Sequence, residues 1–214
     1  EHAYLFQTEI ERGESAKEIR TAIEFKLKEN VPLAAEEVVF DYDITTPDPT
    51  KKKQLATVSV YPREVAEMYM LAMSEIGITP ISLETEGEAT IRSIIDWRSN
   101  ETTMVVDIGK VGSELSIVSG GEQVFATSIE VSGDSFTHAL ERFFQCSYVE
   151  AERMKEEKGF IKNAENEEVF EVLIAPVSNL RDEINKHLAY WHMHRGVQQA
   201  ENSEVVKILL TGGG

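Results

Sequence analysis

The sequence predicts an α/β fold with α+β elements, divided into two halves. Two observations carry this prediction: strand-like and helix-like patterns alternate along the first hundred residues, and three strand-like segments follow one another over residues 103–131 before a series of helices. A polar run at residues 98–101 separates the two patterns. We therefore expect one domain over residues 1–100 and a second over residues 101–214.

The first half opens with a strand–helix–strand–strand pattern. Apolar residues at 4–10 predict a strand, and Ser15 followed by Glu18 forms a capping box that begins a helix. Alternating apolar residues predict two further strands over residues 38–44 and 54–61. The apolar face of the helix repeats every four residues: Ile19, Ile23 and Leu27.

A second helix is predicted between Pro62 and Gly77, because proline favours a helix start and glycine a helix end. We interpret its apolar stripe as core: Val65, Met68, Tyr69, Ala72, Met73 and Ile76. The apolar residues at 78–83 predict a strand, and residues 88–95 a further helix.

The second half is predicted to open with a meander of three strands, at residues 103–108, 114–118 and 123–131. Helices follow at 134–145, 147–158 and 167–194. Pro176 lacks an amide hydrogen and should kink or break the last of these helices. A final buried strand over residues 205–210 leads into three glycines.

The composition excludes several classes of partner and binding site. The 214 residues include 21 basic and 38 acidic side chains, a formal net charge of −17, which disfavours a nucleic-acid backbone or an anionic lipid surface as the primary partner. One cysteine excludes an internal disulfide framework and a cysteine-based zinc site, and fits a reducing compartment. No apolar run approaches the roughly 18 residues of a spanning helix, so no direct membrane insertion is expected.

A candidate phosphate-binding hairpin begins where the first strand of the second half ends. Asp107 and Gly109 lie at the strand end, and Ser113 starts the next strand. Glycines let backbone amides approach an anion, a hydroxyl can donate to it, and an aspartate can hold Mg²⁺ through water. Taken alone, the same residues also suit an ordinary turn.

Three further motifs follow in order. Gly133 and Thr137 stand at a predicted helix start. On the next helix, Glu152 and Lys155 share one face, which suits a ribose diol but also an exposed salt bridge of about 0.2–0.5 kcal/mol. The run Gly212-Gly213-Gly214 follows the last strand and would admit the flat face of a base.

The four spaced motifs together resemble the actin-like ATPase superfamily, and within it the PilM family of type IV pilus assembly proteins, which is related to the cell-division protein FtsA. The resemblance implies an actin-like fold in which the first half contains an inserted interaction domain and part of the first actin-like domain. It also implies that the site residues bind ATP with Mg²⁺. Their implied roles are phosphate contact for the hairpin and for Gly133 and Thr137, Mg²⁺ through water for Asp107, ribose contact for Glu152 and Lys155, and base contact for Gly212, Gly213 and Gly214.

The implied function is assembly of a type IV pilus or a type II secretion-like machine. The protein would be cytoplasmic and peripheral to the inner membrane, recruiting the cytoplasmic tail of a PilN-like partner under nucleotide control. Self-association belongs to the same expectation, and ATP hydrolysis is left open because this fold can bind nucleotide with little turnover. Two alternatives remain: an FtsA-like division protein, and a scaffold whose nucleotide site has decayed, since Lys110 and Glu114 depart from the family pattern.

The two ends of the sequence add a further expectation. The chain opens at Glu1 without methionine and stops on glycine, and the resemblance places the first phosphate hairpin before Glu1. We therefore expect a fragment that carries one wall of a nucleotide cleft, with the second actin-like domain truncated at its C-terminus. These 214 residues alone are expected to bind ATP weakly or not at all.

Overall fold

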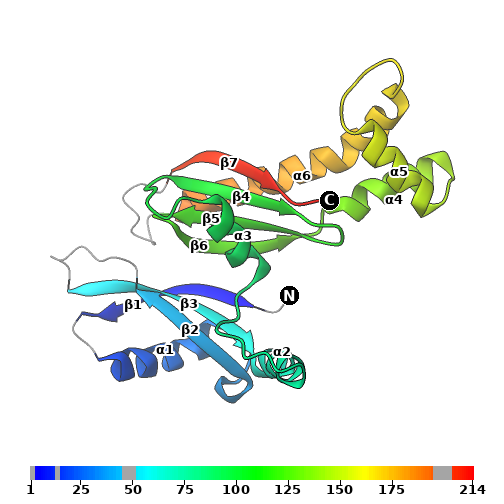
Figure 1. Ribbon diagram of the computed structural model, residues 1–214. Coiled ribbons are helices and arrows are strands. Elements are labelled where there is room, and N and C mark those ends of the chain that lie inside the picture. Colours follow the sequence, from blue (N-terminus) through cyan, green and yellow to red (C-terminus); the bar gives the residue numbers. More distant parts are fainter. Residues whose placement is uncertain (1–2, 13–14, 45–51, 195–203) are drawn as a thin grey trace. The chain divides into compact units, whose positions relative to one another are not determined.

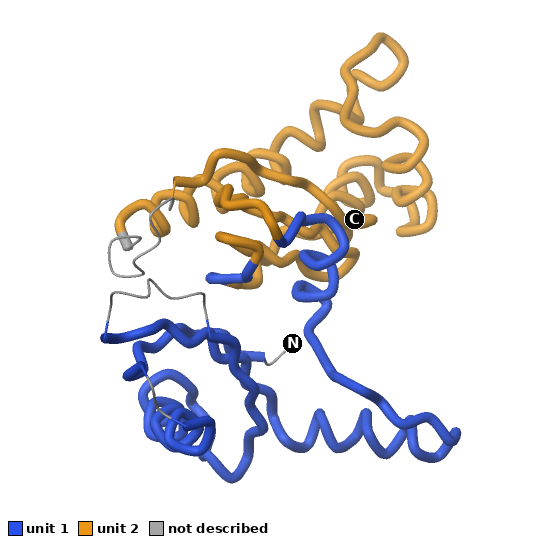
Figure 2. Tube along the Cα trace, turned by 60° about the vertical axis from the view of Figure 1, so that its left-hand side comes forward, with its two compact units in different colours: residues 1–97, 122–125 blue, residues 98–121, 126–214 orange. Residues whose placement is uncertain are grey.

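The structure is a computed structural model that describes residues 3–12, 15–44, 52–194 and 204–214 (Figure 1). Two compact units can be distinguished (Figure 2). Unit 1 comprises residues 1–97 and 122–125, and unit 2 comprises residues 98–121 and 126–214. Within these described ranges, none of the helices combines the length and apolar character that crossing a membrane requires.

Unit 1 is built on a three-stranded antiparallel sheet in the order β1-β3-β2. The strands are β1 (Tyr4–Glu11), β2 (Val38–Ile44) and β3 (Lys53–Pro62). Helix α1 (Ala16–Asn30) follows β1, and a short 3-10 turn, η1 (Ala35–Glu37), precedes β2. The predicted strand–helix–strand–strand pattern is thereby confirmed.

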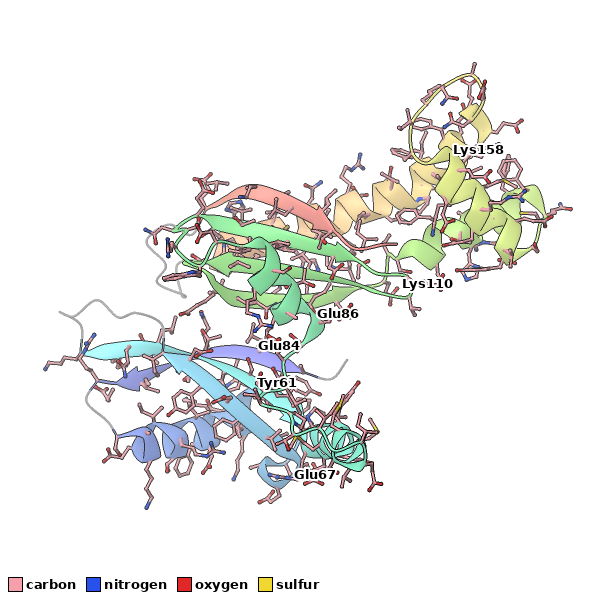
Figure 3. The ribbon with its side chains drawn as sticks, in the orientation of Figure 1. Tyr61, Glu67, Glu84, Glu86, Lys110 and Lys158 are labelled. Carbon is pink, nitrogen blue, oxygen red and sulfur yellow. The ribbon has the colours of Figure 1, made fainter. Side chains whose placement is uncertain are left out.

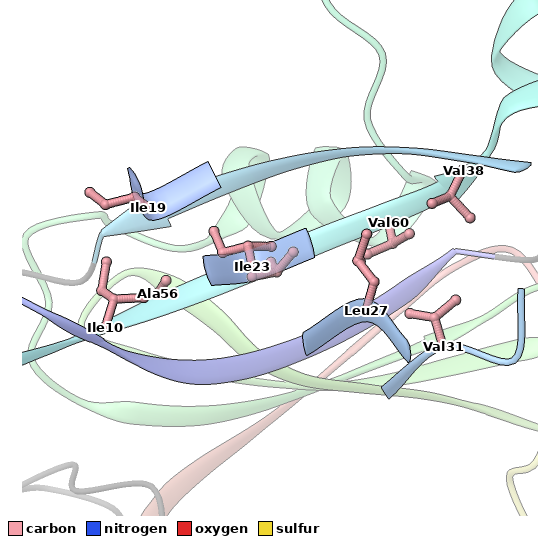
Figure 4. Close-up of a cluster of buried hydrophobic side chains, with 9 residues drawn as sticks. Ile10, Ile19, Ile23, Leu27, Val31, Val38, Ala56 and Val60 are labelled. Atoms are coloured by element: carbon pink, nitrogen blue, oxygen red, sulfur yellow. The ribbon is translucent and has the colours of Figure 1, made fainter. Parts of the chain in front are cut away.

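Helix α1 begins at the predicted capping box. The amide of Ser15 donates to Glu18 Oε2 at 2.7 Å, and the amide of Glu18 donates to Ser15 Oγ at 3.4 Å. The predicted apolar face is buried and packs into one cluster with the sheet, where each fully buried side chain contributes roughly 1.5–3 kcal/mol. Figure 4 shows this cluster: Ile10, Ile19, Ile23, Leu27, Val31, Val38, Ala56, Val58 and Val60.

Helix α2 (Arg63–Glu75) has the predicted bounds, but the interpretation of its apolar stripe as core is wrong. None of its residues is buried, and Met68 and Tyr69 of the predicted stripe are 59% and 53% exposed. The helix is anchored at its start, where the Arg63 guanidinium donates to the carbonyls of Glu36 and Val38 at 2.9 and 2.8 Å. The periodicity of apolar residues shows only that they share one face of a helix and does not show that the face is buried. In unit 1 the buried cluster contains residues of α1 and none of α2.

The predicted strand at residues 78–83 is also wrong, because this segment has no strand pairing and leaves Ile81 fully exposed. Helix α3 (Glu86–Ile94) follows and begins at a capping box formed by Thr85 and Glu88. The Glu88 carboxylate also accepts hydrogen bonds from Ser59 Oγ and Tyr61 Oη, at 2.9 and 2.8 Å. Burial, and then the neighbouring Glu88 carboxylate, raise the pKa of Tyr61.

Apart from residues 122–125 of β6, unit 2 contains the predicted meander and one parallel strand, in the sheet order β6-β5-β4-β7. The strands are β4 (Thr102–Ile108), β5 (Ser113–Ser119), β6 (Glu122–Ile129) and β7 (Val205–Thr211). Strand β4 pairs with β5 antiparallel and with β7 parallel. A turn at Gly120 and Gly121, both at positive φ, joins β5 to β6.

The expectation that the last strand is buried is wrong. Strand β7 stands at the sheet edge, and Val206 and Leu210 are 64% and 65% exposed. The apolar composition of β7 resembles that of β4, whose Met104 and Val106 are completely buried. The difference arises from position in the sheet, which a strand pattern does not encode.

Three helices complete unit 2: α4 (Gly133–Phe144), α5 (Tyr148–Lys158) and α6 (Glu167–His194). The predicted break at Pro176 is absent, and α6 runs continuously through it. A proline removes one backbone hydrogen bond, but Leu173 and Leu180 on either side are buried and hold both flanking turns in place. The helices share a small core of Leu140, Ala151, Val169 and Leu173.

Candidate functional site

Three of the predicted glycine segments meet at one end of the unit 2 sheet. The Gly133 amide, at the start of α4, donates to the Gly109 carbonyl in the β4–β5 hairpin at 2.9 Å. The next amide, of Asp134, donates to the Lys110 carbonyl at 2.8 Å. The Gly214 amide, beyond β7, donates to the Ile108 carbonyl at 2.8 Å. The hairpin, the α4 start and the glycines after β7 therefore form one junction, here called the glycine junction.

The glycine junction has no room for a side chain at four of its glycines, Gly109, Gly133, Gly212 and Gly214, of which two illustrate the reason. A Cβ on Gly133 would lie 2.7 Å from the Cα of Gly214 and 3.4 Å from that of Lys110. Gly212 has φ +99°, and a Cβ there would lie 2.6 Å from Asp107 Oδ1. Glycine is thus required by close backbone approach at Gly133 and by both approach and backbone conformation at Gly212.

The structure does not bring the two predicted hairpin side chains together. Asp107 pairs with Glu114 across β4 and β5, while Ser113 pairs with Ile108, so Asp107 and Ser113 occupy successive positions that face opposite sides of the sheet. Asp107 lies beside Gly212. The buried Ser113 hydroxyl donates to the Val131 carbonyl at 2.6 Å, which uses its proton within the fold.

The predicted residues of α4 and α5 do come together. Lys155 Nζ lies 3.1 Å from Thr137 Oγ1, 3.0 Å from Glu152 Oε2 and 3.3 Å from the Gly133 carbonyl. Thr137 is fully buried and donates to the Glu152 carboxylate. This hydrogen bond first, and then Lys155, lower the pKa of Glu152. The pair is therefore part of a three-residue network beside the glycine junction, more enclosed than a surface salt bridge.

The sequence does not indicate the contact between Tyr148 and Asp134, or that Lys110 lies beside Tyr148. Tyr148 Oη donates to Asp134 Oδ1 at 2.5 Å, and Lys110 Nζ lies 5.4 Å from the centroid of the Tyr148 ring. Lys110 stands at the end of the hairpin near α4 (Figure 3). In the sequence, Lys110 is notable only because it departs from the family pattern. Nothing in the sequence indicates that a lysine in the hairpin contacts a tyrosine 38 positions later.

An open cavity of about 520 Å³ lies between α4 and α6 and extends to Val111 of the hairpin and to Asp134. Ser135, His138 and Arg142 line it from α4, and Val172, Pro176 and Asn179 line it from α6. None of the predicted site residues contributes to it. Among the described residues, no group of three His, Cys, Asp or Glu side chains is arranged to hold a metal ion directly.

A family model for the type IV pilus assembly protein PilM matches residues 7–214. The chain belongs to the PilM family. This membership selects the pilus branch over the FtsA-like alternative. The curated proteins contain no match to the sequence.

Solved structures share the fold of this PilM-family chain. A PilM–PilN type IV pilus biogenesis complex matches with a TM-score of 0.75 at 20% identity, covering 100% of this chain and 60% of that chain. MreB5 of Spiroplasma citri bound to ADP matches with a TM-score of 0.57 at 19% identity, covering 72% and 55%. The AMPPNP-bound form of MreB5 matches with a TM-score of 0.55 at 19% identity, covering 71% and 54%. The fold is actin-like, as predicted, and the chain spans little more than half the length of these relatives.

Proposed function

We propose that this chain acts in type IV pilus assembly and forms one wall of an ATP site. The glycine junction beside the Thr137–Glu152–Lys155 network is the observation that carries the nucleotide proposal. The chain's own atoms occupy the space that a Cβ would need at Gly133 and Gly212, whereas a Cβ at Gly112 or Gly213 would meet nothing within 4 Å, so a ligand would approach the backbone of the junction at these two open glycines. The MreB5 structures, which hold ADP and AMPPNP on the same fold, support this proposal.

Each part of the site has a distinct task in this proposal. The amides of Gly133 and Asp134 are already bonded to the hairpin, so the hairpin itself supplies the phosphate cradle between Gly109 and Ser113. Asp107 holds Mg²⁺ through water beside the phosphates. When bound, ATP supplies the charge and binding energy that bias domain closure.

The remaining groups recognise the nucleoside. Glu152 and Lys155 contact the ribose, and Thr137 positions both of them through its hydroxyl. Gly212, Gly213 and Gly214 present a side-chain-free surface to the base. No residue is assigned as a catalytic base, and the proposal concerns binding.

The proposed partner is the cytoplasmic tail of a PilN-like inner-membrane protein, which would place the protein at the cytoplasmic face of that membrane. Family membership and the likeness to the PilM–PilN complex support this partner. Nucleotide-driven closure would then present or hide the surface that binds the tail. Self-association is part of the same proposal.

NMR of the isotope-labelled 214-residue chain tests the nucleotide site, because weak binding still moves amide resonances. Millimolar ATP with Mg²⁺ should shift the amides of Gly109, Gly133 and Gly213 and leave that of Gly77, in unit 1, in place. Junction amides that stay unchanged both in this chain and in the parent protein, which would carry both walls of the cleft, would contradict the nucleotide proposal. Binding of a PilN-like tail peptide to the parent protein, with and without ATP, tests nucleotide control separately.

A scaffold without nucleotide is the second candidate, and two observations favour it. The Ser113 hydroxyl is bonded to a backbone carbonyl, and Glu114 lies directly opposite Asp107, where it would repel a phosphate. This candidate expects the tail peptide to bind with the same affinity at every ATP concentration. The two titrations therefore distinguish the candidates.

A further inference from the structure

Asp134 closes a ring of contacts that joins the hairpin to α5. Its amide holds the Lys110 backbone at 2.8 Å, and its carboxylate accepts from Tyr148 Oη at 2.5 Å. The Lys110 ammonium in turn lies over the Tyr148 ring, 5.4 Å from its centroid. Three segments distant in sequence, namely the hairpin, the α4 start and the α5 start, thus meet in these three residues.

The charges around the glycine junction single out Lys110. Lys155 is bonded to the Glu152 carboxylate, the Thr137 hydroxyl and the Gly133 carbonyl, so its donors are engaged. Lys110 is exposed and held by Tyr148. Tyr148 first, and then Asp134, raise the pKa of Lys110, so it remains a cation throughout the physiological range.

An exposed cation–π contact is weak compared with a phosphate contact. Such a contact changes an equilibrium by about two- to fivefold, whereas a hydrogen bond to a charged group changes it by tenfold or more, on the order of 10–100. The Lys110 backbone already lies in the phosphate hairpin, and its four-carbon stem lets the ammonium leave the ring without moving the backbone. A polyphosphate on the hairpin would therefore outcompete the Tyr148 ring.

We propose that Lys110 is a phosphate ligand that Tyr148 holds away from the hairpin until a polyphosphate binds. The inference rests on the proposed nucleotide site and adds its regulation. Tyr148 is the first residue of α5, the helix that carries Glu152 and Lys155. Release of Lys110 removes its direct contact with α5, while Asp134 still bonds to the Lys110 backbone and to Tyr148, so phosphate binding would change the contacts of the ribose-contacting helix without detaching it from the hairpin.

The test follows the Tyr148 ring and the ligand affinity together in the 214-residue chain. Tyrosine ring resonances are recorded by NMR during titration with tripolyphosphate, ATP or adenosine, and the Tyr148 resonance is assigned from Tyr148→Phe. Tripolyphosphate and ATP should move the Tyr148 resonance, while adenosine should move only the junction amides. Lys110→Met should weaken ATP binding about tenfold and leave adenosine binding unchanged.

Tyr148→Leu gives the discriminating result, because removal of the ring should tighten ATP binding about two- to fivefold. Tyr148→Phe retains the ring but loses the Asp134 hydrogen bond, and it should give an intermediate affinity even if the leucine variant does not fold. Lys162→Met is the matched control, since Lys162 Nζ lies 5.9 Å from the Phe170 ring centroid in the segment between α5 and α6. Lys162→Met should change neither the affinity for ATP nor the affinity for adenosine.

Three results would overturn the inference in distinguishable ways. If ATP moves the junction amides while Lys110→Met binds ATP like the wild type, Lys110 is no phosphate ligand and the nucleotide site stands. If Tyr148→Leu or Tyr148→Phe weakens ATP binding, Tyr148 contacts the ligand itself and does not hold Lys110 away from the hairpin. If neither ATP nor adenosine moves any junction amide, in this chain or in the parent protein, the proposed function fails and this inference fails with it.

Discussion

Replacement of Gly133 by alanine tests whether the glycine junction is specified by close backbone approach. The new Cβ would lie 2.7 Å from the Gly214 Cα and 2.9 Å from its carbonyl carbon, whereas carbon atoms in contact prefer about 3.5–4.0 Å. The backbone must therefore yield by about 0.8 Å, and overpacking of this kind costs about 1–3 kcal/mol. Alanine also favours a helix over glycine by up to about 1 kcal/mol. We expect a net loss of up to about 2 kcal/mol in the free energy of unfolding of unit 2.

Urea unfolding followed by tryptophan fluorescence measures this loss, because Trp191 in unit 2 is only 1% exposed. The NMR resonance of the Gly214 amide reports the displacement directly, since its bond to the Ile108 carbonyl must lengthen or break. Gly213→Ala is the matched control, as a Cβ there meets nothing within 4 Å. A Gly133→Ala chain as stable as the wild type, with its Gly214 amide unmoved, would refute the close approach.

Three other perturbations follow from the fold. Ile23→Ala should lower the free energy of unfolding of unit 1 by about 2–5 kcal/mol, while Leu71→Ala should change it by less than about 0.5 kcal/mol, measured by circular dichroism in urea. The lowered pKa of Glu152 predicts stabilisation that is complete above its usual value of 4.5 and is lost as the pH falls through the lowered value. Thermal unfolding across acidic pH should therefore fall less steeply for Glu152→Gln than for the wild type. Pro176→Ala restores a helical amide and should raise the unfolding temperature of unit 2.

Local signals in the sequence predict most elements of the fold. The capping box at Ser15 and the four-residue spacing of Ile19, Ile23 and Leu27 predict both the start of α1 and its buried face, because both effects act within one helix. Burial of α2 and β7 could not be predicted in the same way. Whether Leu71 or Val206 is covered depends on elements distant in sequence, and the apolar pattern is the same in either case.

In the candidate site, too, some features can be predicted from the local sequence and others depend on distant residues. Glycines with no alternative, such as Gly133 and Gly212, mark the junction in the sequence because only glycine fits where two backbones touch. The direction in which a hydroxyl or an ammonium points is set by partners far along the chain. Ser113 therefore bonds to Val131, and Lys110 lies over Tyr148, neither of which the spacing of the motifs indicates.

The backbone contacts and the side chains of the proposed site thus have different roles. The close approach of backbone segments at the glycine junction depends little on side-chain chemistry, and in our proposal it defines the place of the ligand. Side chains around it decide whether that place is used, since Thr137 arranges Glu152 and Lys155. A member of this family could therefore keep the fold and the junction while losing nucleotide binding through side chains alone. Affinity measured for Glu152→Gln against Gly133→Ala would separate these roles, because only the second change should also move the Gly214 amide.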